Sequence, residues 1–144
     1  MDHFYEEVYG FSGVDLFALY KKMVSRFDSG SHFVEVGAFL GRSAVFMAVE
    51  IINSGKNIKF DCVDHWEGSE EHNDNDKVNL ETLYEDFVEN IKPVKGVINP
   101  VRGNSIEVSK FYKPNSLDFV FIDASHDEES VKADLAYWMP TISS

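Results

Sequence analysis

The amino-acid sequence predicts an α/β protein with a doubly wound parallel sheet and helices on both faces. Helical and strand patterns alternate along the chain in the order αβαβαβαβα. The run "LDFVFIDA" is almost continuously apolar, as is typical of a parallel strand buried on both faces. Acidic residues follow three of the predicted strands, at the edge where open parallel sheets bind ligands.

Composition restricts the class of protein. A chain of 144 residues suits one domain, residues 1–144, with a modest core. The net charge of −12 argues against nucleic-acid partners. The sequence has no long apolar run and no secretion signal, so we expect a cytoplasmic protein without a membrane partner. Cys62 is the single cysteine, which excludes intrachain disulfides and cysteine-rich zinc sites.

The first half of the sequence predicts two helices, and a strand follows each of them. The first helix ends at "DSGS", before the strand "HFVEV", and its apolar face consists of Leu16, Tyr20, Met23, Val24 and Phe27. The second helix starts near Arg42, ends at "NSGKN" and has the apolar stripe Val45, Phe46, Val49 and Ile52. The segment "IKFDCV" is the second strand.

The second half opens with an acidic stretch, "DHWEGSEEHNDNDK", which lacks periodicity and predicts a loop. An amphipathic helix follows, with apolar positions Leu80, Leu83, Tyr84, Phe87, Val88 and Ile91. "VINPVRG" predicts a short strand, and "SIEVSKFY" a helix of about two turns begun by a serine cap. The apolar run "LDFVFIDA" is the fourth predicted strand. The last helix follows it and places on one side Val131, Leu135 and Trp138.

The stretch "FVEVGAFLGRS" suggests the kind of ligand. A dinucleotide site favours G-x-G-x-x-G, whereas Gly37 and Gly41 are spaced G-x-x-x-G, and Glu35 would repel a pyrophosphate. An amino group suits Glu35 better. Asp64 ends the second strand, where a carboxylate can accept both ribose hydroxyls. These residues predict a site for a nucleoside with a positively charged tail.

At these residues the sequence resembles the class I S-adenosylmethionine-dependent methyltransferases, in particular small O-methyltransferases of the catechol and sugar or macrolide type. "VEVGAFLGRSAVFMA" is similar to their first motif and "CVDHW" to their second. "RGNSIE" is similar to the segment at the adenine edge, and "DFVFIDASHDEESVKADLAYW" to the fourth-strand motif. The resemblance runs from about residue 30 to residue 139, and the motifs in this order are more specific than any one alone.

The resemblance implies a short, about four-stranded version of this Rossmann-like fold, with S-adenosylmethionine as cofactor. It assigns the methionine end of the cofactor to the acid, glycines and serine of the first motif with a neighbouring aromatic, namely Glu35, Gly37, Phe39, Gly41 and Ser43. It assigns the ribose to Asp64 and the adenine to His65, Asn104 and Ser105. It implies that Asp123 stands at the cofactor and magnesium position of the metal-dependent members.

The resemblance further implies methyl transfer to a hydroxyl of a small polar substrate. His126 occupies the place where the catechol type carries a lysine base, and a neutral imidazole can accept a hydroxyl proton near pH 7. Each assignment has a structural alternative, because acids, glycines and polar side chains at strand ends also cap helices and form turns. A non-catalytic module that binds the cofactor or a partner therefore stays open.

The sequence departs from the family after the last predicted helix, at "WMPTISS", where the resembling enzymes continue into a fifth strand. Without that strand, Asp123 would be a single protein ligand, which is too few for magnesium unless substrate oxygens complete the site. The fourth strand would also form an edge of the sheet. Since an apolar edge invites pairing with another chain, we expect either a homo-oligomer, such as a dimer, through this edge or a piece of a longer protein.

Overall fold

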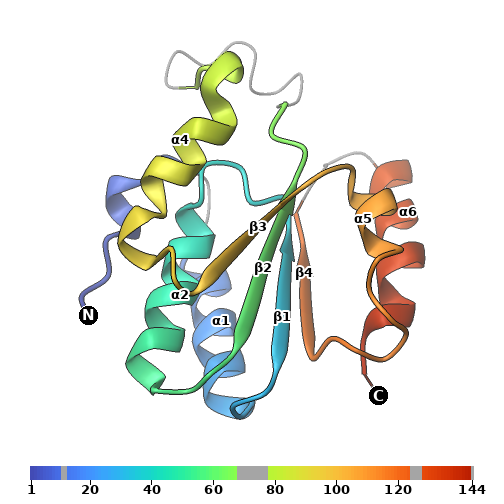
Figure 1. Ribbon diagram of the computed structural model, residues 1–144, viewed down its shortest axis with the longest axis horizontal. Helices are drawn as coiled ribbons and strands as arrows, with labels where there is room; N and C mark the ends of the chain where they lie inside the picture. Colours follow the sequence, from blue (N-terminus) through green and yellow to red (C-terminus); the bar gives the residue numbers. More distant parts are fainter. Residues whose placement is uncertain (11–12, 68–77, 124–127, 144) are drawn as a thin grey trace.

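The computed structural model describes residues 1–10, 13–67, 78–123 and 128–143. It contains a four-stranded parallel sheet with strand order β3-β2-β1-β4 (Figure 1). The strands are β1 His32–Val36, β2 Lys59–Asp64, β3 Ile98–Arg102 and β4 Phe119–Ile122. This confirms the predicted doubly wound α/β fold. In the described part of the chain, no helix is long and apolar enough to cross a membrane.

Helices cover both faces of the sheet. The three on one side are α1 Val14–Arg26, α2 Arg42–Ser54 and α4 Leu83–Asn90, and they share the larger hydrophobic cluster. The two on the other side are α5 Ser105–Ser109 and α6 Glu128–Trp138, which enclose a smaller cluster around Trp138 (Figure 1). Short 3₁₀ turns occur at η1 Tyr5–Glu7, η2 Leu80–Thr82, η3 Lys92–Val94 and η4 Met139–Thr141.

Three residues of the predicted apolar faces lie outside the core, since Ile52, Val88 and Leu135 are 38%, 42% and 45% exposed. The second helix is buried nearly all round over its first turns, so the core takes Met47 and Ile51 as well as the predicted Val45, Phe46 and Val49. A helix that is covered on several sides shows a weak stripe, and its spacing therefore identifies the inward positions poorly.

The predicted serine cap of α5 is also wrong. Asn104 is the N-cap, and its side chain accepts hydrogen bonds from the N–H groups of Ile106, at 3.0 Å, and Glu107, at 3.4 Å. Both asparagine and serine are good N-caps, and here the asparagine stands one residue earlier in the extended conformation that a cap requires. The helix is shorter than expected and ends at Ser109.

The apolar fourth strand lies at an edge of the sheet that the structure describes, as the sequence predicts. Its residues are therefore half-buried, and the expectation of burial on both faces is wrong. At the amino-terminal end of this edge, Leu117 pairs with Ile142 in a parallel bridge. The main-chain N–H of Ser143 donates to the carbonyl of Leu117 at 2.7 Å, so this bridge covers only the beginning of the edge.

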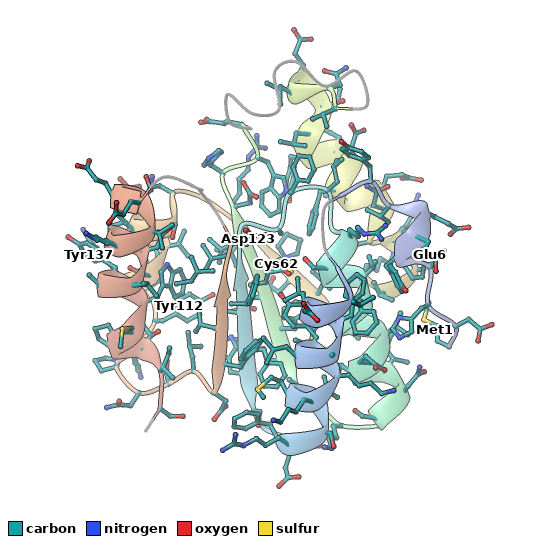
Figure 2. The ribbon with its side chains drawn as sticks, turned by 180° about the vertical axis from the view of Figure 1, so that it is seen from behind. Met1, Glu6, Cys62, Tyr112, Asp123 and Tyr137 are labelled. Carbon is teal, nitrogen blue, oxygen red and sulfur yellow. The ribbon has the colours of Figure 1, made fainter. Side chains whose placement is uncertain are left out.

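A polar network that the sequence did not predict joins three strands. The carboxylate of Asp61, on β2, accepts hydrogen bonds from His32 Nε2 at 2.7 Å, the Tyr112 hydroxyl at 2.8 Å and Asn99 Nδ2 at 3.1 Å. Tyr112 lies in the space between the sheet and α6 (Figure 2). The network satisfies a carboxylate that is only 2% exposed.

Candidate cofactor-binding site

The carboxyl ends of all four strands meet at one edge of the sheet, at the top of Figure 1. Main-chain hydrogen bonds continue from the strands into the loops that follow. Gly37 donates to Val63 at 2.8 Å and Asp123 donates to Val36 at 2.7 Å. Gly103 donates to the carbonyl of Asp64 at 2.9 Å. The predicted site residues of the described strand ends are therefore held at the same edge.

The loop between β1 and α2 contains three residues with positive φ. These are Gly37 at 94°, Phe39 at 53° and Gly41 at 97°. Phe39 is held in this unusual conformation by two hydrogen bonds, because its N–H donates to Asp64 Oδ2 at 2.9 Å and its carbonyl accepts from Trp66 Nε1 at 2.8 Å. A non-glycine residue in this region is a sign of a conformation that the surroundings impose.

Gly41 is required by packing as well as by its φ. A Cβ atom at this position would lie 3.2 Å from atoms of Phe87 and Ile91, which pack against the loop. Gly41 is also the N-cap of α2. The turn and the packing therefore already require a glycine at position 41, and its contact with a cofactor stays a prediction.

Glu35 is the central acidic side chain of the site. It is 1% exposed, and its Oε1 atom accepts hydrogen bonds from the Tyr20 hydroxyl at 2.6 Å and from Ser43 Oγ at 2.5 Å. The other oxygen, Oε2, is buried without a hydrogen-bond partner in the described part of the protein. A buried acceptor without a donor is costly, and this one suits a ligand that brings a donor such as an amino group.

Burial raises the pKa of Glu35 from 4.5 to about 7. The hydrogen bonds from Ser43 and Tyr20 act in the opposite direction. The nearby carboxylates of Asp123 and Asp64 add to the increase. The group thus titrates near neutral pH, and a positively charged donor would favour its ionised form.

Asp64 links the two loops of the site. Its carboxylate accepts hydrogen bonds from the N–H groups of Phe39, at 2.9 Å, and Trp66, at 2.8 Å. Each oxygen keeps a second lone pair, so Asp64 can still accept hydroxyl groups of a ribose. The neighbouring His65 is exposed, and its Nδ1 accepts from the N–H of Glu67 at 2.9 Å.

The two predicted adenine contacts after β3 both have structural bonds. Asn104 caps α5, as described above. Ser105 Oγ donates to Asp134 at 2.6 Å and accepts from Trp138 Nε1 at 2.8 Å, so it joins α5 to α6. Their contact with an adenine stays a prediction.

Asp123 directly follows β4 and lies at the upper end of the strands in Figure 2. Among the described residues, no three His, Cys, Asp or Glu side chains come together in a way that could hold a metal ion. The predicted magnesium role of Asp123 therefore gains no support. His126 lies outside the described residues, as do residues 68–77 of the predicted acidic loop.

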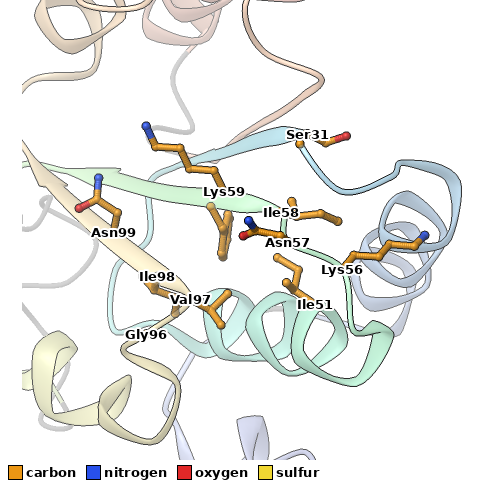
Figure 3. A pocket seen from close by; sticks show the side chains of 12 residues that line it. Ser31, Ile51, Lys56, Asn57, Ile58, Lys59, Gly96, Val97, Ile98 and Asn99 are labelled. Atoms are coloured by element: carbon orange, nitrogen blue, oxygen red, sulfur yellow. The ribbon is translucent and has the colours of Figure 1, made fainter.

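A separate pocket of about 620 Å³ lies at the opposite, amino-terminal end of the strands (Figure 3). It is lined by Gly30, Ser31, Ile51, residues 56–60 and residues 96–99. Nζ of Lys56, one of these residues, donates to the carbonyl groups of Val24, Ser25 and Phe27 at the end of α1. None of the predicted site residues lines this pocket.

Sequence reasoning missed two residues that shape the site. Tyr20 was assigned to the apolar face of α1, although a core-facing tyrosine hydroxyl needs a partner, and this signal could have suggested a polar group beneath it. Trp66 follows the second strand and has a φ of 55°, and its indole supports Phe39. No periodicity points to Trp66, because it stands in a loop.

The fold is that of the class I methyltransferases, and comparison with known proteins agrees. A family model described as a methyltransferase domain matches residues 34–144. The chain belongs to this methyltransferase domain family. No curated protein matches the chain.

Solved structures with the same fold are distant in sequence. Cofactor-bound Rv0187 from MTB has a TM-score of 0.65 and 16% identity, and the match covers 94% of this chain and 55% of that one. Phosphoethanolamine N-methyltransferase 2 from Haemonchus contortus, in complex with S-adenosylmethionine, has a TM-score of 0.59 and 15% identity over 91% and 26%. A protein-L-isoaspartate O-methyltransferase has a TM-score of 0.56 and 19% identity over 92% and 34%. The chain therefore spans about half or less of these proteins.

Proposed function

We propose that this chain binds S-adenosylmethionine and takes part in methyl transfer from it to a hydroxyl group of a small polar molecule. The observation that carries the proposal is the buried Oε2 atom of Glu35, which has no donor in the described part of the protein. Glu35 stands one residue before the end of β1, which leads into a loop with three positive φ values. An amino group of the cofactor would supply the missing donor.

The residues present fit the cofactor. Glu35 and Ser43 would hold its methionine end and Asp64 its ribose. Asp64 suits this role because both of its oxygens retain an acceptor lone pair. His65 and Asn104 stand at the adjoining strand ends, where an adenine would extend. Ser105 fits less well, because its hydroxyl already makes two hydrogen bonds.

Charge also supports a cationic ligand. The chain has a net charge of −12, and Glu35, Asp64 and Asp123 place three carboxylates around one edge of the sheet. Such a field attracts cations and repels phosphates. It therefore favours a sulfonium cofactor over a dinucleotide.

S-adenosylmethionine supplies an electrophilic methyl group. The chain's own contribution would be to orient the cofactor through Glu35 and Asp64 and to remove a proton from the acceptor hydroxyl. We assign that last role to His126 on the basis of the sequence resemblance. The choice of oxygen as acceptor rests on the same resemblance, since the similar structures include both an N-methyltransferase and an O-methyltransferase. Magnesium is not part of this proposal.

Calorimetric titration tests the cofactor. We expect saturable binding of S-adenosylmethionine and S-adenosylhomocysteine, and no binding of NAD at the same concentration. Absence of binding by a folded sample would contradict the proposal. Turnover with hydroxylated acceptors is the second step, and binding without turnover would support the non-catalytic module instead. If the wild type does transfer the methyl group, His126→Ala should abolish transfer while leaving cofactor binding unchanged.

We also propose that the exposed edge of β4 pairs with a second copy of the chain. The support is the outermost position of β4 and the partial exposure of its apolar residues. Sedimentation at micromolar concentration tests this, and a monodisperse monomer would contradict it. The cytoplasmic location expected from the sequence stays a prediction.

A further inference from the structure

The hydroxyl of Tyr20 connects helix α1 to the acidic residue of the candidate site. It donates to Glu35 Oε1 at 2.6 Å, across 15 residues of sequence. Both side chains are buried. Tyr20 precedes the residues that match the family model, 34–144, and so belongs to none of the motifs discussed above.

We propose that Tyr20 is a positioning residue for the cofactor. Its hydroxyl occupies Oε1 of Glu35 and thereby keeps Oε2 available for the amino group of S-adenosylmethionine. This inference rests on the proposed function, because it names the residue that prepares Glu35 for that ligand.

Two contacts hold the tyrosine ring in place. The ring meets Phe119 edge-on, at 5.9 Å between centroids and 87° between planes. It meets Phe121 in the same way, at 5.6 Å and 88°. Because β4 supports the ring from the side, the hydroxyl has little freedom to leave Glu35.

The carboxylate is held from two helices at once. Tyr20 donates from α1 and Ser43 donates from α2, and both bonds reach the same oxygen. The two oxygens of a carboxylate are equivalent, so a half-turn restores the same two bonds and again leaves the other oxygen without a donor. Within the described part of the protein, one oxygen of Glu35 is therefore unsatisfied in either orientation.

Hydrogen bonds are what favour ionisation of Glu35. The titratable groups around it are Tyr20 on α1, Cys62 on β2, and the carboxyl groups of Asp64 and Asp123 at the strand ends. The two carboxylates oppose ionisation of Glu35, whereas the hydroxyls of Ser43 and Tyr20 favour it. Burial raises the pKa of Tyr20 well above 10, so its hydroxyl remains a donor throughout the neutral range. Loss of this hydroxyl should shift the ionisation of Glu35 to higher pH.

The Tyr20→Phe variant tests the proposal, because it keeps the ring and removes only the hydroxyl. We expect calorimetric titration at pH 6.5 to show binding of S-adenosylmethionine about tenfold weaker than in the wild type. The difference in affinity between the variant and the wild type should narrow as the pH is raised toward 8. Tyr112→Phe is the control, since it removes a half-buried hydroxyl that bonds Asp61 on the other face of the sheet. Its pH profile of binding should follow the wild type.

A second measurement needs no cofactor. Urea unfolding of the wild type, Tyr20→Phe and Glu35→Gln is followed between pH 4.5 and 7.5. A raised pKa in the folded state means that stability falls as the pH rises through this range. Glu35→Gln should lose this fall. Tyr20→Phe should show the fall extended to higher pH, because the unfolded chain sets where it begins and the pKa of Glu35 in the folded state sets where it ends.

The outcomes separate the inference from the proposed function. If the wild type binds the cofactor and Tyr20→Phe matches its affinity and pH profile, the positioning role is overturned while the function stands. Equal unfolding profiles of these two proteins would overturn the role of the hydroxyl, even if Tyr20→Phe binds the cofactor weakly. A folded wild type that binds neither cofactor form overturns the proposed function, and the positioning role is overturned with it.

Discussion

The carboxylate of Asp64, at the end of β2, holds the main chain of Phe39 in the loop that follows β1. The N–H of Phe39 donates to Asp64 Oδ2 at 2.9 Å, and φ of Phe39 is 53°. This conformation costs a non-glycine residue about 1–2 kcal/mol. The same carboxylate accepts the N–H of Trp66, so one side chain ties together the two loops of the candidate site.

We expect Asp64→Ala to lower the free energy of unfolding by about 2 kcal/mol, because two main-chain N–H groups lose a charged acceptor. It should also weaken binding of S-adenosylmethionine, since the loop at Phe39 is released. Urea unfolding and calorimetric titration measure the two effects. The control is Asp118→Ala, which removes an acceptor of the His32 N–H at the other end of the sheet. Equal losses of binding in both variants would show that the effect is not specific to the site.

The two glycines that flank α2 should respond differently to alanine. Gly41 has φ 97°, and a Cβ atom added there would press against Phe87 and Ile91. Gly55 has φ 71°, and a Cβ atom added there would meet nothing within 4 Å. We expect Gly55→Ala to cost about 1 kcal/mol from its φ alone, and Gly41→Ala about 3 kcal/mol because overpacking is added. Thermal or urea unfolding measures both. Equal costs would mean that the loop shifts away from the new methyl group.

Asp61 should make the protein sensitive to acid. Burial by itself raises the pKa of Asp61, but the hydrogen bonds from His32, Tyr112 and Asn99 outweigh burial and hold it below 3.8. A group whose pKa is lowered by folding stabilises the protein above its unfolded value, and this stabilisation is lost as the pH falls through the folded value. Glu35 acts in the opposite direction at higher pH.

We therefore expect urea unfolding to show that the wild type loses stability as the pH falls below about 4. The Asp61→Asn variant should be less stable at pH 6 and should lack this loss. The difference between the two proteins removes the contribution of titrating groups that do not contact Asp61. A constant difference from pH 6 down to pH 2.5 would contradict the assignment.

Ser105 should matter more to stability than to the cofactor. Its removal leaves Asp134, which is 5% exposed, without this donor, and the Trp138 indole without this acceptor. We expect Ser105→Ala to cost about 2 kcal/mol in urea unfolding. Ser109→Ala is the matched control, since among the described residues that hydroxyl bonds only the Ile106 carbonyl of its own helix, and it should cost less than about 1 kcal/mol.

The titration of S-adenosylmethionine into Ser105→Ala separates the two roles of this residue. Unchanged affinity, once the variant is shown to be folded, would assign Ser105 to the contact between α5 and α6. A loss of affinity that exceeds the loss in Ser109→Ala would instead support the adenine contact implied by the sequence resemblance.

The sequence by itself determined the order of the elements, the parallel sheet and the edge at which Glu35, Asp64 and Asp123 stand. The reason is that helical and strand periodicities are local, and strands joined by helices become parallel neighbours with one defined hand. The edge position of β4 followed from the family resemblance, because the resembling enzymes continue into a fifth strand. Burial along α2 and the exposed Leu135 did not, because they depend on which elements cover each helix.

Only the tertiary structure decided which polar groups meet. The bond from Tyr20 to Glu35 spans 15 residues, that from Ser105 to Asp134 spans 29, and that from Tyr112 to Asp61 spans 51. A buried hydroxyl or carboxylate must find some partner, so the sequence implies that such bonds exist. The partner itself is set by helix packing against the sheet, and this packing leaves Oε2 of Glu35 unsatisfied within the described part of the chain.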